Sequence, residues 1–512
     1  CLFWMMLSIF LYTIGANLEF PSDPWTHFRR IFEWQNIQLI EESTCKHKFA
    51  YFLGHSFLGW IEPSNRRFAT DLYGTACLLL LAFQTYKLAK TLGLRESWAR
   101  LSVLSSIFFL GYANIGFYAY HGISSSQISL LAAFAAIRLS IKLFKKPSTT
   151  ATAILFGALA LSGFNHIQGL IIWSMVSFGI FIASIISKFG WRKSGRGLVI
   201  LSVLTVICCY PFISNFVEDS SVRPDFEATK WILPWGGINP FGQEHLFHTL
   251  GLFGTINIIA GFFILRKNNM LGLITVIVPI LLMLTPIGFA LIYILIEANN
   301  TPIVFHRTLY GTLPIFAFLF FLQDKTLKYK LNDYISAPLV GIFLTFFSII
   351  QSPPIFGKAW SILIRPTQIQ ELIPMDQTAQ WLKVNAPIPQ NQYFLSDAAT
   401  EWAINSHLGL ISSNKLDRRI PEDLKARLKK IGGVNGVIKD GRIAGILCLS
   451  NQPKIDPAGS FCGKISGHWD PYTIEKNLPF DPSIEDDLQK LISHGWTKTA
   501  VPPWYSLYLR PK

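Results

Sequence analysis

Charged residues are scarce in this sequence. Only 15% of its 512 residues are Asp, Glu, Lys or Arg, and its mean hydropathy is +0.36, whereas average soluble domains carry about 25% charge. Seven cysteines are too few for a disulfide scaffold, and the 36 glycines follow no collagen period. The 41 phenylalanines also exclude a disordered chain. The composition therefore excludes an ordinary soluble enzyme and predicts a polytopic membrane protein.

Several nucleotide and nucleophile motifs are also missing from the sequence. It contains no Walker A loop, no dinucleotide-binding glycine motif between a strand and a helix, and no GxSxG elbow. No internal repeat of the transporter kind is evident. These absences argue against ATP as a driving force and against a nucleotide sugar as a substrate.

Long apolar runs, in contrast, recur up to Ile350. A helix needs about 20 mostly apolar residues to cross the hydrocarbon layer of a bilayer. The sequence predicts an all-α polytopic membrane bundle of about 11 transmembrane helices, of which the ninth is kinked at Pro286. The predicted spans are Phe3–Leu18, Phe68–Tyr86, Leu101–Tyr118, Ile123–Ile141, Ala151–Phe164, Ile167–Ile186, Gly197–Ile213, Leu246–Leu265, Met270–Ile296, Ile303–Leu322 and Tyr334–Ile350.

Lysine and arginine in the short loops predict the orientation of these spans. One set of loops holds 17 Lys and Arg against three acids, whereas the opposite side before residue 352 holds nine against 13. The basic loops, predicted to be cytoplasmic, are 87–100, 138–146, 188–196, 266–269 and 323–333. The net charge of +14 is then mainly a topology signal and not a sign of nucleic-acid binding. We expect a membrane domain over 1–351, with outer loops 19–67 and 214–245, and an extracytoplasmic domain over 352–512.

The segment 352–512 has the composition of a soluble α/β domain, with 19 Lys and Arg and 15 acids. Helical patterns occur at Met375–Val384, Pro421–Lys430 and Ser483–His494. Strand patterns occur at Tyr393–Leu395, Gly436–Val437, Ile443–Leu449, Trp496–Val501 and Trp504–Leu509. Cys448 and Cys462 enclose a loop in this outward-facing domain, so a disulfide between them is plausible.

All eleven histidines fall on the outer side of this topology or at outer helix ends. This distribution suggests chemistry on the outer face, although short basic loops would also produce it by chance. His121 and His166, in two short outer turns, are candidate substrate-binding residues.

The first outer loop contains a candidate general base, Asp23, which is followed by Pro24. Because Pro favours the first position of a helix, Asp23 also fits a simple helix N-cap. Asp23 and His27 would share a helix face, so a metal pair is conceivable, but no third ligand stands nearby. We therefore predict no metal site, and assign His27 to substrate binding.

A second candidate site lies at the start of the tenth span, where Arg307 follows His306 and precedes Tyr310. An arginine in an apolar span is costly unless it is paired, lines a polar cavity, or extends its side chain to the surface. A guanidinium at headgroup depth also suits a phosphate, to which it donates charge-assisted hydrogen bonds.

These segments together resemble the GT-C superfamily of integral-membrane glycosyltransferases, in the group around the family 39 mannosyltransferases and the aminoarabinose transferases. The resemblance spans essentially the whole chain. Its carriers are the acid after the first span in Phe20–His27, the long first loop, and Phe305–Tyr310. The pair Ala379–Pro387 and Phe394–Asp397 also resembles tails of bacterial members. Many members carry paired acids in the first loop, whereas Asp23 has no adjacent second acid.

The resemblance implies transfer of a sugar from a polyprenyl-phosphate carrier to a glycan, lipid or protein acceptor on the outer face of the cytoplasmic membrane. In such a reaction Asp23 would accept the acceptor's proton, while Arg307 and His306 would stabilise the lipid phosphate. Tyr310 would bind substrate. The resemblance fixes no cofactor and leaves a divalent metal open. Two alternatives remain: a lipid-linked glycan ligase or polymerase, and a non-enzymatic transporter or flippase.

Overall fold

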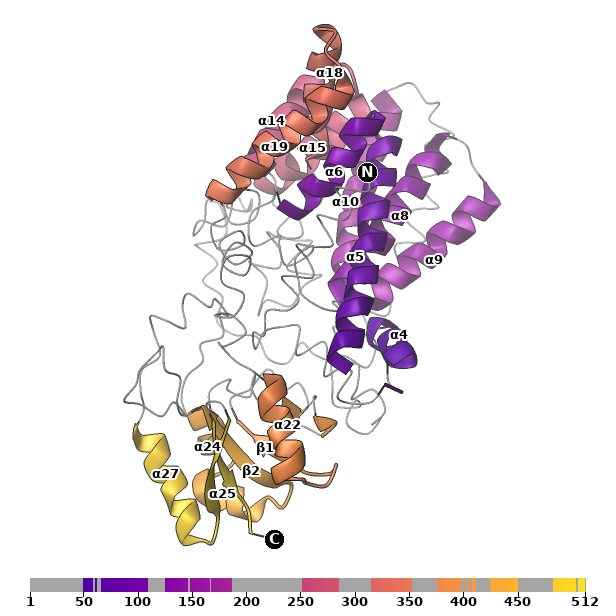
Figure 1. Ribbon diagram of the computed structural model, residues 1–512. Coiled ribbons are helices and arrows are strands. Elements are labelled where there is room, and N and C mark those ends of the chain that lie inside the picture. Colours follow the sequence, from indigo (N-terminus) through magenta and orange to yellow (C-terminus); the bar gives the residue numbers. More distant parts are fainter. Residues whose placement is uncertain are drawn as a thin grey trace. The chain divides into compact units, whose positions relative to one another are not determined.

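The computed structural model describes residues 49–58, 60–61, 66–108, 125–145, 148–165, 167–186, 251–284, 315–351, 375–396, 401, 404–405, 408–410, 424–449, 482–502 and 505–511. The chain divides into two compact units. One takes residues 1–15, 75–120 and 125–360, and the other takes 16–74, 121–124 and 361–512. The first is helical where it is described, and the C-terminal part of the second is an α/β domain (Figure 1).

The helices before residue 352 coincide with apolar runs of the sequence. They are α4 (Phe49–Leu58), α5 (Arg66–Thr91), α6 (Glu96–Phe108), α8 (Ser125–Lys145), α9 (Thr149–Asn165), α10 (Ile167–Ile186), α14 (Gly251–Ile264), α15 (Asn269–Leu284), α18 (Phe316–Lys328) and α19 (Asp333–Gln351). Nine predicted spans overlap one of these helices, and α10 has the predicted bounds. The helix α18 continues to Lys328, six residues past the predicted end. The predicted spans Phe3–Leu18 and Gly197–Ile213, and the kink at Pro286, lie outside the described residues.

A continuous apolar core joins α5, α6, α8, α9, α10, α14, α15, α18 and α19. Its largest fully buried side chains include Trp98, Phe134, Trp173 and Phe316. Trp173 donates a hydrogen bond from Nε1 to Ser140 Oγ at 3.0 Å, so the buried indole is satisfied as well as packed.

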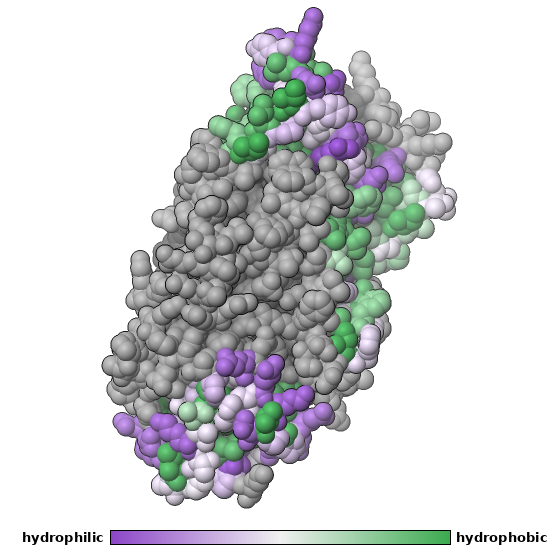
Figure 2. All heavy atoms as spheres, in the orientation of Figure 1, coloured by the Kyte–Doolittle hydropathy of each residue, from purple (hydrophilic) through white to green (hydrophobic). Residues whose placement is uncertain are grey.

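The helices also expose large apolar side chains, visible as hydrophobic colouring over the described helices in Figure 2. Phe263 of α14 is 68% exposed, and Ile342 of α19 is 62% exposed. Isolated exposed apolar residues are ordinary, but here the exposure recurs along several helices. Within the described ranges, none of the helices combines the length and the apolar character needed to cross a membrane.

The C-terminal domain is built on a four-stranded mixed sheet in the order β1-β2-β4-β3. The strands are β1 (Tyr393–Leu395), β2 (Ile443–Leu449), β3 (Thr497–Val501) and β4 (Tyr505–Leu509). β1 runs parallel to β2, whereas β4 is antiparallel to both β2 and β3. Helices α22 (Met375–Asn385), α24 (Leu424–Lys430), α25 (Gly433–Lys439) and α27 (Pro482–Ser493) complete the described part of the domain.

Alternation along the strands sends side chains to two separate cores, one on each face of the sheet. Phe394, Leu447 and Leu507 pack with Leu382 of α22 on one face. The other core contains Tyr393, Ile446 and Tyr508 together with side chains of α24, α25 and α27. The domain therefore has three layers: α22, the sheet, and the remaining helices.

Two polar interactions complete the interior of this domain. Arg427 of α24 donates a hydrogen bond from Nη2 to Glu401 Oε2 at 2.6 Å, and both side chains are at most 2% exposed. The carboxamide of Asn405 bonds to the N–H and the carbonyl of Phe394, at 3.1 and 3.0 Å, and so continues the hydrogen bonding of β1.

Cys448 on β2 is disulfide-bonded. Its expected partner, Cys462, lies outside the described residues.

The sequence predicted most of this domain correctly, including β1 and β2 with their observed bounds. The strand predicted at Gly436–Val437 is wrong, because these residues belong to α25. Gly432 and Gly433 before them have φ values of +91° and +65°, which start a new helix after α24. Arg510 then binds the carbonyl oxygens of Val437, Ile438 and Asp440, which stabilises the end of α25.

Candidate functional site

All seven candidate site residues of the sequence lie outside the described residues: Asp23, His27, His121, His166, His306, Arg307 and Tyr310. Their mutual geometry is therefore not tested. His166 is the single residue between α9 and α10, both of which are described. The described helix ends that flank these residues in the sequence are the parts of the structure nearest to them along the chain.

At one end of the helical bundle α8 and α10 begin and α9 ends, and these three helix ends contain serines and Asn165 but no charged residue; we call this place the neutral end. Ser129 Oγ donates to the Ser162 carbonyl at 3.0 Å and accepts from the Gly169 N–H at 3.1 Å. Ser162 Oγ donates to the Ser129 carbonyl at 3.0 Å. Because Gly169 belongs to the first turn of α10, Ser129 satisfies one of the N–H groups that a helix start leaves open.

Gly169 allows the close approach of these helices. A Cβ at this position would lie less than 3.0 Å from Ser129 Oγ, Ser162 Oγ and the Ser129 carbonyl oxygen. A side chain would therefore separate α10 from α8 and α9. The residue type at this one position fixes how tightly the neutral end is packed.

Asn165, the last residue of α9, is the most unusual polar side chain at the neutral end. It is 1% exposed, and its Nδ2 donates to the Leu161 carbonyl at 2.5 Å. Its Oδ1 is buried and has no hydrogen-bond partner among the described residues. In the sequence Asn165 stands beside His166 in a predicted short outer turn, as one of its hydrogen-bonding groups, but it is not among the residues predicted to bind substrate. The feature of the sequence that could have drawn attention to it is an asparagine at the end of an apolar helix.

The opposite end carries charged side chains and is called the charged end below. It consists of three turns, Leu92–Arg95, 265–268 and 329–332, which join α5 to α6, α14 to α15 and α18 to α19. Arg138 Nη1, two turns before the end of α8, donates to Gln84 Oε1, two turns before the end of α5, at 2.5 Å, so the C-terminal parts of these two helices lie side by side. The start of α8 therefore lies at the end of the bundle away from the charged turns.

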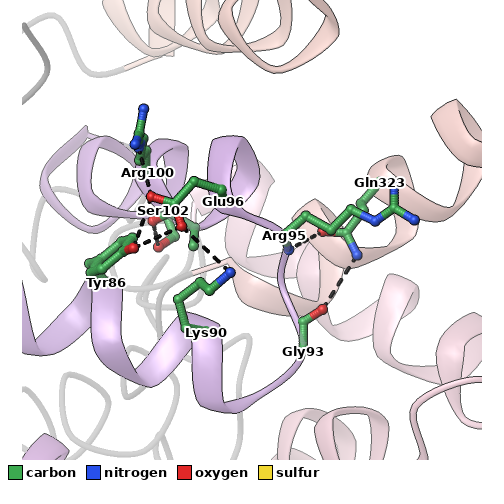
Figure 3. A network of polar contacts seen from close by, with 9 residues as sticks. Tyr86, Lys90, Gly93, Arg95, Glu96, Arg100, Ser102 and Gln323 are labelled. Carbon is green, nitrogen blue, oxygen red and sulfur yellow. Dashed lines mark hydrogen bonds and ion pairs between the residues drawn. The ribbon is translucent and has the colours of Figure 1, made fainter. Parts of the chain in front are cut away.

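Glu96 organises one part of the charged end, as Figure 3 shows. The Tyr86 hydroxyl donates to the Glu96 carboxylate at 2.8 Å, Arg100 Nε donates to it at 2.9 Å, and Lys90 Nζ lies 3.5 Å away. Burial opposes ionisation of this carboxyl. The hydrogen bonds and the two cations outweigh burial and lower the pKa of Glu96.

Asp333, the first residue of α19, organises the other part. Its carboxylate accepts hydrogen bonds from Trp98 Nε1, Arg95 Nη1 and Thr326 Oγ1, each at 3.1 Å. Burial again opposes ionisation, but these three donors outweigh it and lower the pKa of Asp333. A carboxylate at the start of a helix also interacts favourably with the helix dipole.

Side-chain amides and one ion pair connect the three turns. Gln323 Oε1 accepts from the Arg95 N–H at 2.6 Å (Figure 3), and Asn268 Nδ2 donates to the Leu92 carbonyl at 2.7 Å. Lys267 forms an ion pair with Asp324. Glu96 and Asp333, the two carboxylates that accept several hydrogen bonds, both have a lowered pKa, so neither suits proton transfer near neutral pH. These three described turns hold the helices in place, and their side chains show no arrangement typical of catalysis.

Metal-ligating residues do not gather in the described part of the chain. No group of three His, Cys, Asp or Glu side chains there is arranged to hold a metal ion. The candidate pair Asp23 and His27 lies outside those residues, so the sequence-based expectation for it stays a prediction.

No protein-family model and no curated protein matches this sequence. Among solved structures, the oligosaccharyltransferase of Archaeoglobus fulgidus in its apo form has a TM-score of 0.48 and 10% identity, over 87% of this chain and 69% of that chain. The archaeal oligosaccharyltransferase AglB from Archaeoglobus fulgidus, in complex with an inhibitory peptide and a dolichol-phosphate, gives the same values. A complex with Zn and sulfate has a TM-score of 0.49 and covers 67% of that chain. Likeness of this degree establishes neither a shared fold nor a shared activity.

Proposed function

We propose that this chain is an inverting membrane glycosyltransferase that moves a sugar from a polyprenyl-phosphate carrier to an acceptor on the outer face of the cytoplasmic membrane. The observation that carries the proposal is that three basic loops gather at one end of the bundle, opposite the uncharged ends of α8, α9 and α10. The basic loops 87–100, 266–269 and 323–333 belong to the charged end, as the positive-inside rule requires of a cytoplasmic face.

The order of residues in the chain supports a site at the neutral end. His121 stands four residues before α8, His166 separates α9 from α10, and Tyr310 stands six residues before α18. The helix α18 ends in a turn of the charged end, so its start faces the other way. Each of these candidate residues thus adjoins a helix end that points away from the charged turns.

Two further observations support the membrane setting and the orientation. The apolar side chains exposed on α14 and α19 suit contact with acyl chains and with the isoprenoid part of the donor. The disulfide at Cys448 suits a C-terminal domain outside the cytoplasm, because disulfides persist in oxidising compartments.

In the proposed reaction Asp23 accepts the proton of the acceptor hydroxyl as that oxygen attacks the anomeric carbon. A bond from carbon to the acceptor oxygen forms, while the bond from carbon to the phosphate oxygen breaks. The polyprenyl phosphate leaves with the electron pair, and Arg307 and His306 stabilise its charge. His27, His121, His166 and Tyr310 bind the substrates. A single displacement inverts the configuration at the anomeric carbon.

The decisive experiment is sugar transfer by the purified full-length chain in lipid nanodiscs. Radiolabelled undecaprenyl-phosphate mannose, glucose, galactose and aminoarabinose serve as donors, and lipid, glycan and peptide fractions serve as acceptors. We expect Asp23→Asn to reduce transfer at least a hundred-fold, whereas the matched control Asp324→Asn, at the charged end, keeps wild-type turnover. Retained turnover in Asp23→Asn would return Asp23 to a helix-capping role.

A second variant tests the phosphate site. Arg307→Ala should weaken donor binding about a hundred-fold by removing a charge-assisted contact, without lowering the unfolding temperature. Arg266→Ala, an exposed arginine of the charged end, is the matched control. Intact donor affinity in Arg307→Ala would contradict the phosphate role. Lipid translocation by wild type without any transfer would favour a flippase.

A further inference from the structure

Asn165 is buried, but only one side of its carboxamide is satisfied. Nδ2 donates to the Leu161 carbonyl, which can only accept, so the orientation of the amide is fixed by this bond. Oδ1, on the other side of the amide, has no hydrogen-bond partner among the described residues. Buried polar atoms are nearly always hydrogen-bonded, so an open oxygen of this kind requires an explanation.

Poor packing does not explain the open oxygen. The neighbouring polar groups of the neutral end are bonded to one another, with Ser129, Ser162 and Gly169 joined at 3.0 to 3.1 Å. The cluster is therefore closely fitted, and it uses none of its hydroxyl groups to satisfy Asn165. The sequence places Asn165 directly before His166, a candidate substrate-binding residue.

An open carboxamide oxygen selects its ligand by chemistry, because it can only accept a hydrogen bond. A phosphate offers the wrong polarity, and an isoprenoid chain has no donor. The helices α8, α9 and α10 contain no Asp or Glu that would compensate a buried cation beside Asn165. Of the parts of a polyprenyl-phosphate sugar, only the sugar presents neutral O–H donors.

We propose that Asn165 Oδ1 accepts a hydrogen bond from a hydroxyl group of the transferred sugar and so contributes to recognition of the donor. This inference rests on the proposed function and assigns the sugar subsite to the end of α9. Binding of the sugar would satisfy an oxygen that has no partner among the described residues. Asn165 is thus a specificity residue for the donor, and the phosphate, which has no hydrogen to donate when ionised, is recognised elsewhere.

The test compares donors with and without the sugar, using the full-length chain in nanodiscs. The probes are bare undecaprenyl phosphate and undecaprenyl phosphate carrying mannose, glucose, galactose or aminoarabinose. Asn165→Leu, of similar volume, and Asn165→Ala should weaken binding of the preferred sugar-bearing lipid about ten-fold. Binding of bare undecaprenyl phosphate should not change. The unfolding temperature should stay the same or rise in Asn165→Leu, because an unsatisfied polar atom has been removed.

Ser177→Ala is the matched control. Ser177 Oγ of α10 is also buried without a hydrogen-bond partner among the described residues, but it lies two to three turns further along the helix from His166. This variant should not change binding of any lipid.

Three results would overturn the inference. Equal weakening of bare and sugar-bearing lipid would assign Asn165 to another part of the donor. Unchanged binding of both would show that Asn165 does not contact the donor. A clear fall in unfolding temperature for both Asn165 variants would show that a neighbour or a buried water already satisfies Oδ1. If wild type prefers none of the four sugar-bearing lipids over bare undecaprenyl phosphate, the proposed function fails, and this inference with it.

Discussion

Asp333 should be the most sensitive polar residue of the charged end. Its carboxylate receives donors from three elements, of which Trp98 is fully buried and Arg95 is about half exposed. In Asp333→Ala the buried Trp98 N–H loses its acceptor, which costs about 1–3 kcal/mol. The Thr326 hydroxyl loses about 1 kcal/mol, and the exposed Arg95 contact contributes at most about 1 kcal/mol. We expect a total destabilisation of about 3 kcal/mol.

A double-mutant cycle isolates the largest part of this effect. Trp98→Phe removes the indole N–H, so Asp333→Ala in that background should cost about 1–2 kcal/mol less than in wild type. The unfolding temperature of the full-length chain in detergent, followed by loss of the monodisperse chromatographic peak, measures each corner. A loss of about 2 °C per kcal/mol is expected for a domain of this size. Asp324→Ala, which removes only the partly exposed ion pair with Lys267, should lower the unfolding temperature far less.

The same carboxyl predicts a pH dependence. Because folding lowers the pKa of Asp333, its ionised form stabilises the folded chain at pH values above the unfolded pKa of about 3.9. This contribution is lost as the pH falls through the lower folded pKa. The stability difference between wild type and Asp333→Asn should therefore be constant near neutral pH and shrink below about pH 4. Strictly additive effects of Asp333→Ala and Trp98→Phe on stability would refute this account of the Asp333 carboxylate. An Asp333→Ala variant as stable as wild type would refute it as well.

Three further outcomes are expected. Gly169→Ala should lower the unfolding temperature by several degrees, because its Cβ would collide with α8 and α9, whereas Gly157→Ala, with no atom within 4 Å of the new Cβ, should raise stability by up to about 1 kcal/mol. Arg427→Met should destabilise the C-terminal domain by about 3–5 kcal/mol in urea unfolding, and a second substitution, Glu401→Leu, should recover much of the loss. The hydrogen-bonded guanidinium of Arg442 lowers the pKa of Asp440. Asp440→Asn should therefore reduce stability at neutral pH but not below about pH 4. An Asp440→Asn defect that persists at pH 3 would contradict that origin.

The helix positions illustrate what periodicity and hydropathy can predict. The run Ile167–Ile186 contains no charge and no proline, so its helix α10 follows from local sequence alone. The same holds for β2, whose apolar residues lie between turn signals. At Gly436–Val437 local sequence was insufficient, because a short apolar stretch suits both a strand and a helix. Packing of Val437 in the core and the bonds from Arg510 decide in favour of the helix.

The candidate site could be predicted only as a set of residue types on one side of a membrane. Asp23, Arg307 and the histidines were chosen for their chemistry, and they remain predictions. Asn165 was missed because its significance depends on burial and on an open oxygen, neither of which is a property of the residue type. An asparagine ending an apolar helix is commonplace until its surroundings are known.

The sequence by itself determined where most of the described helices and strands lie, which loops are basic, and that helices and strands alternate in the described part of the chain after residue 374. These features follow from interactions within a few residues, or from composition. Only the tertiary structure decided that Trp98 meets Asp333 across 235 residues, and that Arg95 meets Gln323 across 228. It also decided that Ser129, Ser162 and Gly169 of α8, α9 and α10 bond to one another, while Asn165 Oδ1 has no partner among the described residues. Hydrogen bonds between distant segments depend on how the apolar core brings helices together, and no local pattern records that arrangement.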